Sequence, residues 1–93
     1  MTVGLMVLDF ACPGCHSLKD KRRALTSFRE RLRSRFNVAV IESGHQEAWQ
    51  EAQLAVAGVA ESRPLLDRLF QQIDGFAATD PELLLTGTSV EYR

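Results

Sequence analysis

The chain has 93 residues and a formal net charge of −1, with 45% hydrophobic and 25% charged residues. This composition is typical of a globular protein and excludes a disordered tail or a fibrous repeat, and the length suits one domain. No apolar run approaches the roughly 18 to 20 residues that span a bilayer, and the first residues lack the basic and apolar regions of a secretory signal. We therefore expect a single domain over residues 1–93, located in the cytoplasm and without a membrane partner.

The first predicted strand covers residues 2–10, which are apolar and partly β-branched, and Cys12-Pro13-Gly14 ends it as a turn. The residues Ser17-Leu18-Lys19-Asp20 have the signature of a helix start, because the serine oxygen accepts a backbone N–H and the acid lies near the positive helix end. At 100° per residue, five apolar side chains fall on one side of this helix and predict the stripe that packs on a sheet: Leu18, Leu25, Phe28, Leu32 and Phe36.

The middle of the chain predicts two further strands. Asn37 is expected to end the first helix in the left-handed conformation. Residues 38–42 are largely β-branched and predict the second strand, which residues 44–49 connect to the third. Residues 52–59 contain few polar side chains, so we expect the third strand to lie centrally in the sheet.

The last third of the chain predicts a helix and a strand. Ser62-Arg63-Pro64 starts the helix, since proline is tolerated in a first turn, and either Gly75 or Thr79-Asp80-Pro81 ends it. Residues 83–92 supply the last strand. The apolar side of the second helix consists of Leu65, Leu66, Leu69, Phe70, Ile73 and Phe76.

This element order predicts an α+β fold of the βαββαβ type. Two amphipathic helices are expected to cover one face of so small a sheet. The arrangement is that of a ferredoxin-like two-layer sandwich, whose four-stranded antiparallel sheet has the strand order 4-1-3-2. The loops at residues 11–16, 44–49 and 77–82 then emerge at the same end, where a site built from loops would gather.

Positive charge is concentrated in the first predicted helix. Residues 19–35 hold eight of the eleven basic residues and only two acidic ones, for a local net charge of +6. Such segregation predicts a polyanionic partner, and solvated helix flanks or a protein interface are the alternatives. The residues expected to position a phosphate backbone are Lys19, Lys21, Arg22, Arg23, Arg29, Arg33 and Arg35.

Three sequence strings carry a resemblance to a known family. They are P-G-x-x-S-L-K-x-K-R from Pro13, R-F-N-V from Arg35 and G-x-Q-x-x-W-Q from Gly44. With them the chain resembles the YlxP-like family of small bacterial proteins of unknown function, over nearly its whole length. The resemblance implies a ferredoxin-like fold and no established activity. It also implies an RNA-related or ribosome-related setting, because members tend to be encoded near translation and ribosome-maturation factors.

The segment Cys12-Pro13-Gly14-Cys15-His16 matches the C-x-x-C-H pattern. Haem attachment needs export and a second axial ligand, neither of which the sequence predicts. A thioredoxin-type dithiol, or zinc held together with His45, remains an alternative. We expect a turn with two reduced cysteines, and neither a metal nor a cofactor.

The loops of the same sheet end also carry His16, His45, Gln46 and Trp49. Histidine is a side chain that often serves in general acid–base catalysis, but no partner completes either of these two. The sequence contains no G-x-S-x-G and no Gly-rich phosphate loop, so we do not expect an enzyme. Trp49 is expected to pack against the end of the sheet, and not to serve as a platform for stacking bases.

The expected function is that of a non-catalytic accessory protein that binds RNA or a ribosomal subunit through the first helix. The third strand has no aromatic residue in residues 50–60, which excludes the base-stacking sheet of an RRM. The alternative is a protein–protein interaction module, or a homodimer, that uses the open face of the sheet.

Overall fold

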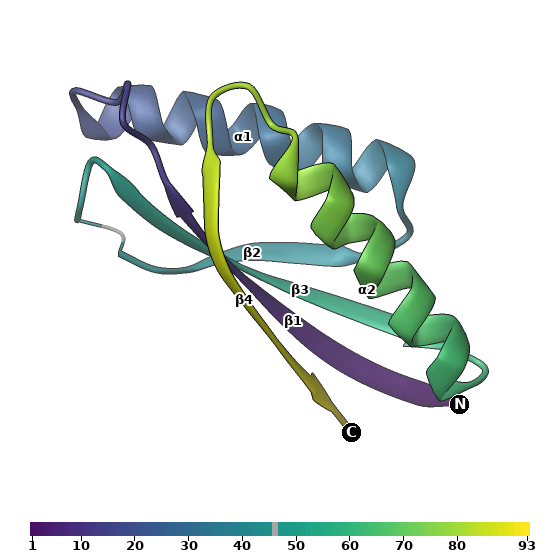
Figure 1. Ribbon diagram of the computed structural model, residues 1–93. Coiled ribbons are helices and arrows are strands. Elements are labelled where there is room, and N and C mark those ends of the chain that lie inside the picture. The colour runs from purple at the N-terminus through teal and green to yellow at the C-terminus, as the bar shows by residue number, and fades with distance from the viewer. Residues whose placement is uncertain (46) are drawn as a thin grey trace.

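The computed structural model describes residues 1–45 and 47–93 and contains a sheet with two helices on one of its faces (Figure 1). The strand order is β2-β3-β1-β4, and neighbouring strands are antiparallel. This is the predicted order read from the opposite edge, so the ferredoxin-like α+β fold is confirmed. The elements are β1 (Thr2–Ala11), α1 (Leu18–Arg35), β2 (Ala39–Gly44), β3 (Glu51–Ala60), α2 (Arg63–Ala78) and β4 (Leu84–Tyr92).

The core lies between the sheet and the helices. Alternate residues of β1 and β3 face the helices and are buried, as in Leu8 and its neighbour in the sheet, Leu54. α2 packs closely where Gly4 and Gly58 pair across these strands, since a Cβ at Gly4 would lie 2.8 Å from Leu66 Cδ2. In the described part of the chain, neither helix is long and apolar enough to cross a membrane.

Both helices begin where the sequence predicts. The Asp20 N–H donates to Ser17 Oγ over 3.1 Å, and the His16 N–H donates to Asp20 Oδ2 over 3.1 Å, so the first turn of α1 is capped from both sides. Ser62 Oγ accepts the Leu65 N–H at the start of α2 over 3.4 Å. The Ser17 and Asp20 contacts fix the N-terminal end of α1, which carries the exposed Lys19, Arg22 and Arg23.

The end of α1 differs from the prediction. α1 ends at Arg35, and Phe36 is already extended, with a φ of −128°. The predicted left-handed Asn37 is wrong, because within the described residues only His45 combines a positive φ, 57°, with a side chain. The Phe36 N–H closes the last turn onto the Leu32 oxygen over 2.8 Å, so the chain leaves the helix one residue earlier. α2 continues through Gly75 and ends at Ala78, directly before Thr79-Asp80-Pro81, so the second of the two predicted ends is confirmed.

β4 is fastened to α2 at the C-terminal end of the chain. The Tyr92 hydroxyl donates to Asp67, and the Arg63 guanidinium lies 4.0 Å from the Tyr92 ring centroid. The hydrogen bond to the Asp67 carboxylate raises the pKa of Tyr92 above its ordinary value. This contact lies at the end of the sheet opposite the loops that carry the candidate site.

Candidate nucleic-acid interface

The outer side of α1 presents a basic surface formed by four exposed side chains. Three of them come from the first two turns and line a shallow depression of about 460 Å³ together with Thr26, Ser27 and Glu30. At 1.5 Å per residue, the surface extends for about 21 Å along the helix. We call this set the basic surface, and its members are Lys19, Arg22, Arg23 and Arg33.

Few acidic groups neutralise the basic surface. Arg23 has Asp20 at 4.0 Å, a long contact between two solvated side chains. Among residues 1–45 and 47–93, no carboxylate lies within 4.0 Å of the charged atoms of Lys19, Arg22 or Arg33. The guanidinium and ammonium groups are therefore available to an anionic ligand.

Lys21 does not belong to this surface, and its predicted contact with phosphate is wrong. Only 3% of its side chain is exposed, because it points from α1 toward the sheet. Its Nζ donates to the His45 oxygen over 2.6 Å and to the Glu51 oxygen over 3.2 Å, and it lies 3.6 Å from Glu42 Oε2. Lys21 thus ties the loop between β2 and β3 to α1.

Two further predicted phosphate ligands have contacts within the fold. The Arg29 guanidinium is part-buried and donates to the Val40 oxygen over 3.4 Å, which fastens α1 to β2. Arg35 is exposed, and its guanidinium carbon lies 5.6 Å from the Phe76 ring centroid. Because both cations already have partners within the fold, neither is counted in the basic surface.

Asp80 is an acidic residue whose role the sequence did not predict. Its side chain is only 1% exposed, and Oδ1 lies 2.7 Å from Arg31 Nη2. Its Oδ2 accepts the N–H groups of Glu82 and Leu83. The Asp-Pro sequence of the turn was the available signal for such local hydrogen bonding. Asp80 neutralises Arg31, which explains why the flank of α1 nearest α2 is not part of the basic surface.

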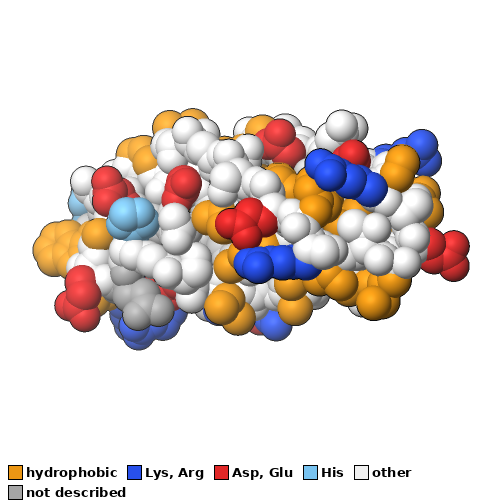
Figure 2. All heavy atoms as spheres, turned by 90° about the horizontal axis from the view of Figure 1, so that it is seen from below, with side chains coloured by type: hydrophobic (Ala, Val, Ile, Leu, Met, Phe, Trp, Pro, Cys, Tyr) orange, Lys and Arg blue, Asp and Glu red, His pale blue; other side chains and the backbone are white. Residues whose placement is uncertain are grey.

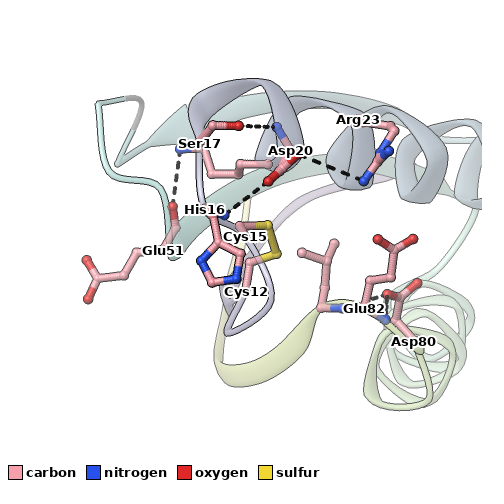
Figure 3. Close-up of a disulfide and its surroundings, with 11 residues drawn as sticks. Cys12, Cys15, His16, Ser17, Asp20, Arg23, Glu51, Asp80 and Glu82 are labelled. Carbon is pink, nitrogen blue, oxygen red and sulfur yellow. Dashed lines mark hydrogen bonds and ion pairs between the residues drawn. A yellow bond between two sulfur atoms is a disulfide. The ribbon is translucent and has the colours of Figure 1, made fainter.

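The two cysteines form a disulfide beside the N-terminal end of α1, as Figure 3 shows. The expectation of two reduced thiols is wrong. The Cys15 N–H donates to the Cys12 oxygen over 3.0 Å, and this turn brings the two Cα atoms to 5.4 Å, within the range that a disulfide spans. Both residues are buried, and their sulfurs are bonded to each other, so in this state neither is a thiolate ligand for zinc.

The predicted gathering of the loops is confirmed. The turn at residues 12–15 lines a cavity of about 340 Å³ together with Asp20 and Arg23 of α1 and with Pro81 and Glu82. The Cys12 N–H also donates to the Gln50 oxygen over 2.8 Å, which joins this turn to the loop between β2 and β3. The three loops are therefore held together around the start of α1.

The two histidines have different surroundings in the structure. His16 is exposed and contributes its backbone N–H to the α1 cap. His45 Nδ1 lies 3.5 Å from Glu51 Oε2. His45 also borders a cavity of about 360 Å³, which Asp9 lines as well, on the open side of the sheet. Among the interactions of the described residues, no hydrogen bond joins His16 to His45. Gln46, also predicted for this loop site, lies outside the described residues.

Trp49 is 53% exposed, so the prediction that it packs against the sheet end is wrong. In the loop that carries Trp49, the Ala48 N–H donates a hydrogen bond to the His45 oxygen over 3.1 Å. The next residue, Gln50, accepts the Cys12 N–H through its backbone oxygen. The backbone of Trp49 is therefore anchored on both sides while the indole faces solvent.

The open face of the sheet is mixed in character. Figure 2 shows hydrophobic side chains scattered among polar ones, with histidine and several acidic side chains gathered at one end. Ile41, Val59 and Leu84 are its most exposed large apolar residues, at 61%, 58% and 59%. Lys and Arg side chains also appear on this view, so the charges of the open face are mixed, in contrast to the basic surface of α1.

Comparison with known proteins identifies the family. Residues 3–90 match the family described as "Protein of unknown function (DUF503)". The chain is also 34% identical over 76 residues to "Uncharacterized protein YlxP" of Bacillus subtilis (strain 168), an alignment that covers 82% of this chain and 83% of the relative. The expected YlxP-like membership is confirmed, and the chain belongs to this family of proteins of unknown function.

Proposed function

We propose that this protein is a non-catalytic, RNA-associated accessory protein that contacts the phosphate backbone through the basic surface of α1. The observation that carries the proposal is the row of exposed Lys19, Arg22, Arg23 and Arg33 side chains with little acidic neutralisation. Cations in this arrangement release counterions from a polyanion and so supply sequence-independent affinity. Ribosomal RNA is the partner that the family resemblance suggests.

The position of these cations adds to the support. Lys19, Arg22 and Arg23 lie within the first two turns of α1, where the helix dipole contributes further positive potential. The capping of this end by Ser17 and Asp20 and the burial of Lys21 hold the helix rigidly against the sheet. A rigid row of cations gives up less conformational freedom when it binds than one on a mobile segment would.

No catalytic step belongs to this proposal. The two thiols are joined in the disulfide, and His45 has a carboxylate neighbour, Glu51, that is itself largely exposed. Such a pair has neither the burial nor the second orienting group that activates a nucleophile or a general base. Binding alone is therefore the function that the geometry supports best.

The salt dependence of RNA binding tests the proposal. Fluorescence anisotropy of a labelled ribosomal RNA fragment should give an association constant that falls steeply between 50 and 200 mM salt. With four phosphate contacts, the slope of log K against log salt is expected to be about −3. A slope near zero, or no association at 50 mM salt, would contradict the proposal.

A further inference from the structure

Trp49 combines an exposed indole with a backbone that is anchored on both sides, and the fold does not require this combination. It is the single tryptophan of the chain, and about half of its surface is exposed. The large aromatic residues of the core lie against each other, as in Phe10 and Phe28 at 5.1 Å between ring centroids. Burying the indole would stabilise the protein, so its exposure on an anchored backbone is a feature that a ligand can use.

The loop that presents Trp49 is fixed relative to the basic surface. Lys21 binds the carbonyl oxygens of His45 and Glu51, which bracket the loop on both sides of Trp49. Lys21 is also the neighbour of Arg22 in α1 and lies two residues from Lys19. Figure 1 shows the loop between β2 and β3 and the N-terminal end of α1 at the same end of the molecule. A ligand that reaches one can therefore reach the other.

An exposed indole at the same end of the molecule as a row of cations suits one form of nucleic acid in particular. Unpaired bases stack on an aromatic face while Lys and Arg follow the backbone, and this mode tolerates any sequence. In a duplex the bases stack on each other, so an A-form RNA helix leaves no base face free to stack on a side chain at its surface. The same phosphate contacts would serve both forms, but Trp49 would contribute only to the unpaired one.

We propose that the RNA bound by α1 is single-stranded where it passes the loop end, and that Trp49 stacks on one of its bases. This inference rests on the proposed function and specifies its substrate class. The basic surface supplies affinity for phosphate, and Trp49 supplies the preference for unpaired RNA over a duplex.

The test uses the tryptophan itself as the reporter. A 12-nucleotide single-stranded RNA, and the same strand annealed to its complement, are each titrated at 50 mM salt. Labelled-RNA anisotropy measures affinity, and intrinsic emission measures contact with Trp49. The single strand is expected to bind more tightly and to quench the emission. Trp49→Ala should weaken its binding by roughly 5- to 150-fold, the effect of removing the partner of one stacked base.

Matched variants separate stacking from other effects. Trp49→Phe keeps an aromatic face and should retain most of the affinity, whereas Leu65→Ala, at another exposed apolar residue, should change nothing. Trp49→Ala should also leave the salt slope unchanged, because no charge is removed. The inference would be overturned if the protein binds RNA without quenching, binds the duplex as tightly as the single strand, and loses no affinity in Trp49→Ala. That result would leave the proposed function standing. No binding of either RNA by the wild type would overturn both.

Discussion

Replacing Lys21 with methionine is expected to lower the free energy of unfolding by about 2–4 kcal/mol. Methionine fills a similar volume, but it leaves the carbonyl oxygens of His45 and Glu51 without their donor. Glu42 is also deprived of the ammonium at 3.6 Å, although its partial exposure lets water compensate in part. The effect is large for a domain of this size, because total stabilities are only about 5–15 kcal/mol.

Urea and thermal unfolding measure this destabilisation, with Lys19→Met as the matched control. Lys19 lies two residues earlier on the same helix, is exposed, and undergoes the same chemical change. Its replacement is expected to change the stability by less than about 0.5 kcal/mol. If both variants are destabilised equally, the Lys21 hydrogen bonds contribute little and the loop is held by other interactions.

The second large effect is expected on RNA binding when the basic surface is neutralised. Replacing Lys19, Arg22, Arg23 and Arg33 with glutamine should reduce the salt slope by about 0.7 to 0.9 for each phosphate that is no longer neutralised. Summed over the four positions, the slope of log K against log salt should become shallower by about 2.8 to 3.6, so almost no salt dependence should remain. Because these side chains are exposed, the variant should remain folded.

Arg68→Gln provides the control for this experiment. Arg68 is an exposed cation on α2, so its removal lowers the net charge without touching the basic surface. Anisotropy titrations at several salt concentrations should find its affinity close to that of the wild type. Unchanged binding by the fourfold variant would mean that the basic residues are merely solvated.

The architecture follows from local patterns in the sequence. The serines at positions 17 and 62 mark the starts of the two helices. The apolar stripes of the helices and the alternating pattern of the strands then predict a two-layer arrangement in which these apolar faces pack together. These signals depend on neighbours within one or two turns, so one sequence suffices to interpret them. The end of α1 was not predictable in this way, because the Phe36 contact with Phe76 of α2, at 5.8 Å between ring centroids, is a tertiary one.

The site was predictable only in part. Lys21 counts as a surface cation in any sum of charges, yet at 100° per residue it falls within the apolar stripe, between Phe28 and Leu25. That position was the available signal of its burial, but its carbonyl partners come from a loop more than twenty residues away. The disulfide and the exposure of Trp49 depend on how the loops meet, which no local pattern encodes.

Amide NMR of the chain titrated with the single-stranded RNA at low salt tests the central claim most directly, because it locates the binding surface residue by residue. The basic surface predicts the largest shift changes in residues 18–27 of α1, with the Trp49 indole N–H among them. Changes concentrated instead on the open face of the sheet, at residues such as Leu5, Val7 and Ala55, would contradict binding through α1.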